Sequence, residues 1–205
     1  MSKADRAKWD ERYRAGAFAE RPHPSALLEA WVSCLPNSCG RSRGRALDLA
    51  CGAGRNSLFL AHHGFEVTGI DISSEGLKRA AASAAHEGLD VTWMRHDLDA
   101  GLPVSGPFDV VCLFRYLNAD VIRRLPSLLA TDGILMVEEH LATDQPVAGP
   151  SNPAFCVQPG ELRRLLPGLD VLHQEEGIIA DPDGRRVAIA RLVGSLAGPR
   201  CILRT

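Results

Sequence analysis

An acidic residue and two glycines stand close together at one point of the chain, in the run Asp48-Leu-Ala-Cys-Gly52-Ala-Gly54. The run follows a short apolar segment and precedes Asn56, where a helical pattern begins. Glycines at such a turn allow a tight bend and let a bound molecule approach the main chain. A Gly-x-Gly turn between a strand and a helix is typical of sites for adenosine-containing cofactors.

Two more acids end the next two strand-like segments. Asp71 ends the second, 17 residues after Gly54, where a carboxylate can accept hydrogen bonds from ribose hydroxyls. Asp97 follows the third, where it would accept from the exocyclic amine of an adenine. Each also has a plainer explanation, Asp71 as an acid favoured by a helix dipole and Asp97 as a solvated loop residue. Three acids at three strand ends, with Asp48, form a more specific pattern than any one alone.

The acid beside the glycines separates two classes of cofactor. In a dinucleotide site this turn faces a pyrophosphate, which Asp48 would repel. S-adenosylmethionine has no phosphate and carries an ammonium and a sulfonium group, so an acid here is favourable. The third position of the dinucleotide fingerprint is Ser57 instead of Gly or Ala, which also weakens the case for a nicotinamide-dependent reductase.

Polar side chains also follow the fourth and fifth strand-like segments, at the same expected edge of the sheet. Arg115 would guide an anionic or aromatic acceptor, since its charge is hard to place in a core. Glu138, Glu139 and His140 are expected to face one pocket, where they would include a general base. Alternatively, Tyr116 packs in the core and Glu138 only holds backbone groups. The candidate catalytic residues are Arg115, Tyr116, Glu139 and His140.

A strand–helix alternation positions these residues. The apolar runs and turn signals predict strands over 45–49, 66–71, 91–95, 108–113, 133–138, 170–179 and 186–193. The 3.6-residue patterns and caps predict helices over 1–17, 25–34, 56–63, 74–87, 120–130 and 161–166. Loops are expected over 36–44 and over the proline-rich stretch 141–160, and Asp132-Gly133 is expected to end a helix.

Strands that alternate with helices and are apolar on both faces predict an α/β fold with a doubly wound, mostly parallel seven-stranded sheet. Asp181-Pro-Asp-Gly184 between the last two strands predicts a C-terminal antiparallel hairpin. The 205 residues are enough for one domain. Its expected parts are an N-terminal helical lid (1–35), a cofactor-binding core (45–140), the proline-rich loop (141–160) and a terminal helix with the hairpin (161–195).

The run DLACGAGRNSLFLAHHGFEVTGIDIS resembles the first motif and following strand of class I S-adenosylmethionine-dependent methyltransferases. It is most similar to the bacterial branch with tellurite-resistance and thiopurine-type methyltransferases, and the resemblance covers roughly residues 45 to 140. It implies a Rossmann-like fold, S-adenosyl-L-methionine as cofactor and S-adenosyl-L-homocysteine as product. The expected cofactor contacts are Asp48, Leu49, Ala50, Gly52, Gly54, Asn56, Asp71, Ile72, Asp97, Leu98, Phe114 and Arg115.

Within that set, the resemblance assigns parts of the cofactor. Asp48 and the two glycines would contact the methionine part, while Asp71 and Ile72 would hold the ribose and flank the adenine. Asp97 with Leu98 would hold the adenine, and Phe114 with Arg115 would line the sulfonium end. Methyl transfer from a sulfonium is an in-line displacement, so the main task is to hold the acceptor close, aligned and dry. A thiolate, phenolate or soft anion attacks already ionised, so a base is needed only for other acceptors.

Composition narrows the partners. Lys and Arg number 23 against 25 Asp and Glu, a net charge of −2, which gives no electrostatic case for nucleic acid or a membrane surface. The charged N-terminus is no secretory signal, so a cytoplasmic location is expected, and no metal site is expected from His62-His63 or the scattered cysteines. The expected partner is a small-molecule methyl acceptor, for a monomer or weak homodimer. A non-catalytic methyltransferase-like binding or scaffold protein is the alternative.

Overall fold

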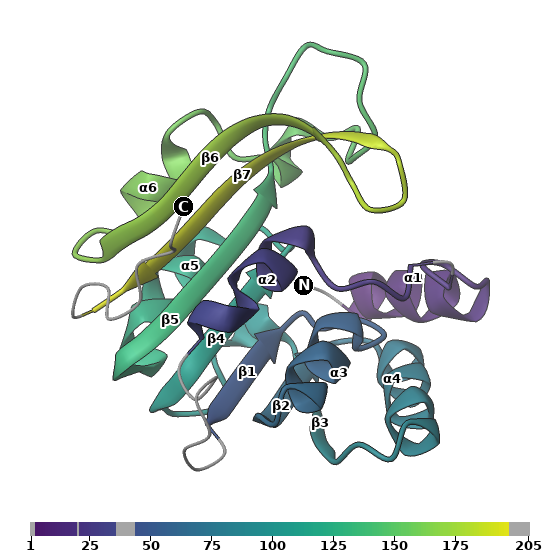
Figure 1. The fold of residues 1–205 in the computed structure, drawn as a ribbon. Coiled ribbons are helices and arrows are strands. Elements are labelled where there is room, and N and C mark those ends of the chain that lie inside the picture. Colours follow the sequence, from purple (N-terminus) through teal and green to yellow (C-terminus); the bar gives the residue numbers. More distant parts are fainter. Residues whose placement is uncertain (1–2, 20, 36–43, 197–205) are drawn as a thin grey trace.

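The computed structural model describes residues 3–19, 21–35 and 44–196, which form a seven-stranded sheet with helices on both faces (Figure 1). The strand order is β3-β2-β1-β4-β5-β7-β6. The strands are β1 (Arg45–Leu49), β2 (Glu66–Asp71), β3 (Val91–Arg95), β4 (Phe108–Phe114), β5 (Leu129–His140), β6 (Asp170–Ala180) and β7 (Arg186–Ser195). The predicted doubly wound, mostly parallel seven-stranded sheet is confirmed.

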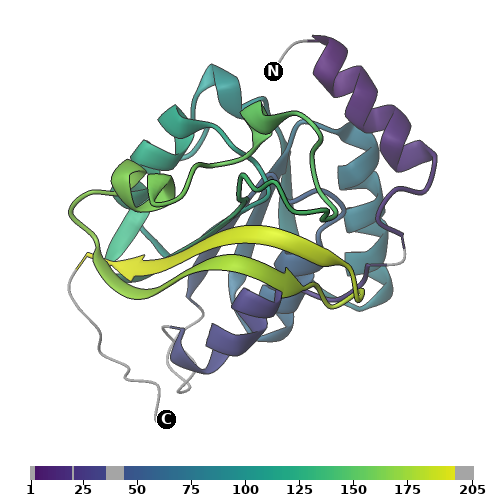
Figure 2. The ribbon, with the colours of Figure 1, turned by 90° about the horizontal axis from the view of Figure 1, so that it is seen from above.

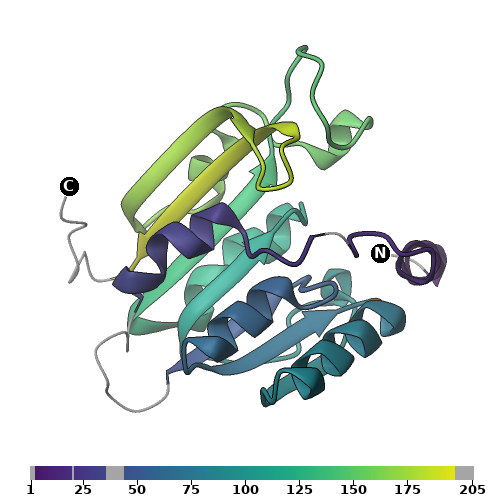
Figure 3. The ribbon, with the colours of Figure 1, turned by 45° about the vertical axis from the view of Figure 1, so that its right-hand side comes forward.

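Five of the strands are parallel, and their carboxyl ends therefore meet at one edge of the sheet. β7 pairs antiparallel with both β5 and β6, which makes the predicted C-terminal hairpin. The order of strands reverses between β1 and β4, and in open α/β sheets ligands bind beside the carboxyl ends at such a point. Figure 3 shows this edge, with the first helix seen end-on beyond it.

Except for α3, the helices are shorter than the sequence predicts, and α2 and α5 each continue into a tighter 3-10 turn. They are α1 (Lys3–Arg14), α2 (Ala26–Trp31), α3 (Arg55–His62), α4 (Ser74–His86), α5 (Ala119–Arg124) and α6 (Glu161–Leu165), with 3-10 turns η1 (Val32–Cys34), η2 (Leu98–Ala100), η3 (Leu125–Leu128) and η4 (Pro153–Phe155). Ser25 and Ser73 cap α2 and α4 through their hydroxyls. From above, α1 and the loop after β5 lie around the carboxyl edge (Figure 2).

Two apolar clusters bury the two faces of the sheet. One gathers Leu47, Val111 and Leu135 of the strands with side chains from α5, η3 and α6. The other gathers Ala46 and Met136 with side chains from α2 and α3. Because successive side chains of a strand point to opposite faces, this alternation is what a sheet covered on both sides requires.

The helix predicted over 120–130 is wrong at its C-terminal end. α5 ends at Arg124, Pro126 lies in η3, and Leu129 already pairs with Phe108 in the sheet. Asp132-Gly133, predicted to end that helix, lies within β5, where the register with β4 shifts. An added Cβ on Gly133 would meet the Phe108 carbonyl at 2.7 Å, so the glycine permits the irregularity. The predicted loop over 36–44 lies almost entirely outside the described residues.

Candidate functional site

The turn between β1 and α3 is built from left-handed backbone. Ala50, Gly52 and Gly54 all have positive φ angles, of 53°, 59° and 84°. The alanine is strained there, whereas the glycines adopt this conformation freely. The Gly54 amide donates to the Cys51 carbonyl (2.9 Å) and closes the turn. The bend turns the chain sharply from β1 into α3 at the carboxyl edge of the sheet.

Tyr13 of α1 lies directly over this turn. An added Cβ on Gly52 would collide with the Tyr13 hydroxyl, and one on Gly76 would meet its ring at 3.0 Å. The ring is buried, and burial together with the charge on Asp71 raises the pKa of the phenol. The N-terminal helix therefore covers the glycine turn through one aromatic side chain. In the sequence, Trp9 and Tyr13 lie one turn apart on one face of the predicted helix, a spacing typical both of a lid and of simple packing.

Asp48 is buried beside the turn, with 1% of its surface exposed. Its Oδ2 accepts a hydrogen bond from the Ser57 hydroxyl at 2.6 Å. Burial raises the pKa of this carboxyl to about 7, against the lowering effects of the Ser57 hydrogen bond and the Arg55 charge. The carboxylate is therefore poised between its two charge states near neutral pH.

Asp71, at the end of β2, is also buried and is held by main-chain amides. Its Oδ2 accepts from the Gly52 amide and its Oδ1 from the Ser73 amide, both at 2.8 Å. Burial raises its pKa, although the Ser73 and Gly52 amides act in the opposite direction. Each oxygen retains a lone pair for a further donor. Asp71 thus joins the glycine turn to the start of α4 and can still accept from hydroxyl groups.

These two acids fit a cationic ligand. Among the described residues, no ion pair joins Asp48 or Asp71 to a basic side chain, and burial raises the pKa of both. A buried carboxylate without a countercharge is costly, and a bound cation relieves that cost. An ammonium or sulfonium beside an adenosine has this charge, whereas a pyrophosphate has the opposite one.

Several other predicted contacts are already engaged within the fold. Asp97 Oδ1 accepts from the Asp99 amide (3.0 Å) and caps η2, while Leu98 is buried in a core cluster. Asn56 Oδ1 accepts from the Ser25 amide (2.8 Å), which fixes the start of α2. The buried members Leu49, Ile72 and Phe114 lie at the strand ends. The cofactor roles of these residues stay predictions.

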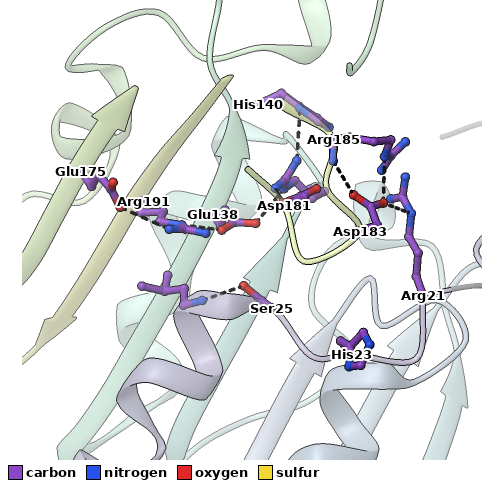
Figure 4. Close-up of polar contacts among 12 residues, drawn as sticks. Arg21, His23, Ser25, Glu138, His140, Glu175, Asp181, Asp183, Arg185 and Arg191 are labelled. Carbon is purple, nitrogen blue, oxygen red and sulfur yellow. Dashed lines mark hydrogen bonds and ion pairs between the residues drawn. The ribbon is translucent and has the colours of Figure 1, made fainter. Parts of the chain in front are cut away.

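Arg115, the residue directly after β4, forms ion pairs with two acids. Its φ is 62°, and its guanidinium donates to Glu138 Oε1 (2.7 Å) and Asp181 Oδ1 (3.1 Å). Glu138 also accepts from Arg191 (2.6 Å), a contact drawn in Figure 4, so one buried carboxylate joins two arginines. Burial opposes ionisation of Glu138, but the charges on Arg115 and Arg191 outweigh it and lower the pKa. Arg115 is therefore fixed by acids from the fifth strand and the hairpin turn.

His140 lies against Arg115 in a defined tautomer. Arg115 Nη1 approaches His140 Nδ1 at 3.4 Å, and a guanidinium can only donate, so Nδ1 accepts and Nε2 carries the proton. Burial and the Arg115 charge lower the pKa of the imidazole to about 4. An imidazole with this pKa and an occupied Nδ1 is a weak proton acceptor at neutral pH.

The prediction that Glu139 shares a pocket with Glu138 and His140 is wrong. Successive strand residues point to opposite faces, so Glu138 and His140 lie together and Glu139 lies on the other face. There its Oε1 accepts from the Tyr116 amide (3.2 Å), and burial raises its pKa well above the usual range. Tyr116 also points away from Arg115, because its hydroxyl donates to Asp99 (2.6 Å). The four candidate catalytic residues therefore form two pairs.

A pocket of ≈ 340 Å³ opens beside the Arg115 cluster, which consists of Arg115, Glu138, Asp181 and Arg191. The pocket lies between the segment before α2, the start of α3 and the β6–β7 turn. It is lined by Arg21, His23, Arg55, Asp181, Pro182 and Asp183. His23 lies between Pro22 and Pro24 in the sequence, a position that indicates a pocket-lining residue. No group of three His, Cys, Asp or Glu side chains in the described part of the chain is arranged to hold a metal. None of the described helices is long and apolar enough to cross a membrane.

Residues 46–133 match a family described as "Methyltransferase domain". The chain is 37% identical over 124 residues to a "Putative methyltransferase YqeM" of Bacillus subtilis, covering 56% of this chain and 49% of the relative. It is 29% identical over 160 residues to a "Ubiquinone biosynthesis O-methyltransferase" of Caulobacter sp., covering 67% and 64%. A "Ribosomal RNA small subunit methyltransferase C" of Alcanivorax borkumensis is 34% identical over 102 residues, covering 45% and 31%.

A solved structure shares the fold. The crystal structure of TehB from Haemophilus influenzae superposes with a TM-score of 0.70 at 21% identity, covering 91% of this chain and 66% of that one. At this identity the likeness establishes the fold. The chain spans about half the length of the curated relative that it matches over 124 residues, and less than two thirds of the other two.

Proposed function

We propose, from the premise that residues 46–133 form a class I methyltransferase domain, that this chain transfers a methyl group from S-adenosylmethionine to a small-molecule acceptor. The observation that carries the proposal is the pair of buried carboxylates, Asp48 and Asp71, at a glycine turn with no basic side chain to pair with among the described residues. A cofactor with an ammonium, a sulfonium and a ribose matches both the charge and the hydrogen-bonding capacity of this pair.

The proposed contacts follow the carboxyl edge of the sheet. Asp48 and the glycine turn hold the methionine part, and Asp71 accepts from the ribose hydroxyls. Asp97 and Leu98 hold the adenine, and Arg115 lies toward the sulfonium end. Tyr13 joins this set because it covers Gly52 and lies beside Asp71. The remaining proposed contacts are Leu49, Ala50, Asn56, Ile72 and Phe114.

When bound, the cofactor supplies an electrophilic methyl group with a neutral leaving group. The chain's own residues then have to orient the acceptor in line and exclude water. Tyr13 and the loop 141–160 lie around the edge of the sheet where the transfer would occur (Figure 2). Polar side chains of the Arg115 cluster line the same edge, and ion pairs hold them in place. No general base is assigned, because His140 has a lowered pKa and an occupied Nδ1, and Glu139 is buried on the other face, where it accepts from the Tyr116 amide. This favours an acceptor that attacks already ionised, such as a thiolate or phenolate.

A small acceptor is favoured over nucleic acid by the net charge of −2 and by the size of the pocket. One relative is named for ribosomal RNA, so the point needs its own test. We expect the purified protein, as a monomer or weak homodimer, to leave tRNA unshifted in gels at low salt. A tight, salt-sensitive complex with tRNA would contradict the small-molecule assignment.

Calorimetric titration with S-adenosylmethionine and S-adenosylhomocysteine tests the cofactor. Wild type should bind at about micromolar Kd, or ~−8 kcal/mol. Asp71→Asn should lose at least tenfold, while Asp120→Asn, at an exposed acid of α5, should bind as wild type does. Absence of binding by a folded wild type would overturn the proposal. Binding without transfer to a panel of thiols, phenols and soft anions would favour the non-catalytic alternative.

A further inference from the structure

Arg55 lies in the pocket beside the Arg115 cluster without a carboxylate partner. It is the first residue of α3, directly after Gly54, and it lines the pocket together with His23 and Asp183. Its Nη1 donates to the His23 carbonyl at 3.2 Å. No ion pair joins Arg55 to any residue in the part of the chain that the structure describes. Burial lowers the pKa of its guanidinium, the direction expected for a charge removed from water.

The two acids of the pocket are already neutralised by other arginines. Asp181 pairs with Arg115 at 3.1 Å. Asp183 pairs with Arg21 at 2.9 Å and with Arg185 at 2.8 Å, and Figure 4 shows these three side chains converging above His23. Within the described residues, Arg55 therefore lines the pocket with no carboxylate at ion-pair distance, although the charges of Glu138, Asp181 and Asp48 act on it from further away.

We infer that this pocket binds the anionic group of the methyl acceptor, and that Arg55 is the residue that recognises it. The inference rests on the proposed function and names the acceptor class as a small organic molecule with a carboxylate or a comparable oxyanion. A guanidinium is planar and donates two parallel hydrogen bonds to such a group, and removal from bulk water strengthens this pairing.

The size and place of the pocket support an organic acceptor. Its volume of ≈ 340 Å³ lies at the lower end of the range of about 300–1,000 Å³ for small-molecule sites. Arg55 follows the glycine turn by one residue, so an acceptor anchored there has its other end next to the proposed cofactor site. The polar lining leaves little apolar surface, which favours a short, polar molecule.

The experiment distinguishes recognition of an anionic acceptor group from binding of the cofactor. Binding of benzoate and phenyl phosphate, with benzamide and phenol as neutral counterparts, is measured by calorimetry on protein saturated with S-adenosylhomocysteine. Wild type should bind at least one anion about tenfold more tightly than its neutral counterpart. Arg55→Gln should abolish that preference, Arg55→Lys should keep part of it, and Arg123→Gln, at an exposed arginine of α5, should keep all of it.

Affinity for S-adenosylhomocysteine is measured on the same variants, with thermal melting to establish that each is folded. We expect Arg55→Gln to bind S-adenosylhomocysteine within about threefold of wild type. A tenfold or greater loss would assign Arg55 to the cofactor carboxylate and overturn the inference. Equal affinity of wild type for the anions and their neutral counterparts would also overturn it. Failure of wild type to bind S-adenosylhomocysteine would count against the proposed function instead, and the anion preference is then measured without it.

Discussion

Ser57 donates a 2.6 Å hydrogen bond to Asp48 inside the carboxyl edge of the sheet, and that hydroxyl is the strongest local stabiliser of the carboxylate. The two residues lie nine positions apart, on either side of the glycine turn, so the bond also links the end of β1 to the first turn of α3. One hydroxyl does not replace the hydration that burial removes, and the pKa of Asp48 stays raised to about 7. The free protein thus carries an acid that is not fully ionised at neutral pH.

Asp48→Asn should stabilise the ligand-free protein at neutral and higher pH. A raised pKa means that the folded state binds the proton more tightly than the unfolded state, so stability is full below about pH 4 and falls as pH rises to about 7. The amide removes this loss and still accepts from Ser57. The gain should be on the order of 1–4 kcal/mol at pH 8 and near zero at pH 4, from ~1.4 kcal/mol per pKa unit. Urea unfolding at both pH values measures it, and a gain independent of pH would contradict the assignment.

Cofactor affinity should rise with pH through the same range. A bound ammonium or sulfonium favours the ionised form of Asp48, so binding releases a proton below about pH 7. Titration of S-adenosylhomocysteine in two buffers of different ionisation enthalpy counts that proton. We expect release at pH 6 by wild type and none by Asp48→Asn, which should also bind more weakly. Equal proton release by both proteins would assign the proton to another group.

The sequence predicted most of the fold because its strands are continuous apolar runs bounded by turn residues. β1, β2 and β3 have the predicted bounds. β5 begins four residues earlier than predicted, since Asp132-Gly133 forms an irregularity inside the strand and a local pattern cannot distinguish that from a helix end. Pairing across the sheet decides between the two.

The polar clusters of the site depend more strongly on tertiary pairing. Arg191 reaches Glu138 because the two are direct partners in the antiparallel register of β5 and β7, 53 residues apart. Asp181 also comes from a distant part of the chain, because the turn between β6 and β7 brings it to Arg115, 66 residues away in sequence. The acids at strand ends were predictable because parallel strands share an edge. The face on which Glu139 lies follows from strand alternation, and that signal was present in the sequence.

Gly52→Ala should cost more stability than Gly64→Ala, although both glycines have positive φ angles, of 59° and 83°. An added Cβ on Gly64 meets nothing within 4 Å, whereas on Gly52 it collides with the Tyr13 hydroxyl. Gly64→Ala should therefore cost about 1 kcal/mol from backbone strain alone, and Gly52→Ala at least ~1 kcal/mol more. Thermal and urea unfolding of both variants measures the difference.

A double variant separates the collision from the strain. Tyr13→Phe removes the hydroxyl, so Gly52→Ala should be less destabilising in the Tyr13→Phe background than in wild type, by on the order of 1 kcal/mol. Strictly additive losses would show that the tyrosine moves aside in solution, and α1 would then not cover the turn as described.

Glu138→Gln should be the most destabilising conservative change in the site. The carboxylate is 2% exposed and pairs with both Arg115 and Arg191, so its loss leaves two largely buried guanidinium groups short of a countercharge. We expect a loss of about 3–5 kcal/mol. Glu175→Gln is the matched control, because Glu175 pairs with Arg191 at 3.2 Å but is 41% exposed, and its loss should cost about 0–1 kcal/mol.

The lowered pKa of Glu138 adds a second signature, since the contribution of this carboxylate to stability is present above about pH 4.5 and disappears as pH falls further. The difference between wild type and Glu138→Gln in urea unfolding should therefore shrink on acidification from pH 6 to pH 3, and equal costs for the two variants at pH 6 would show that solvent reaches this pair.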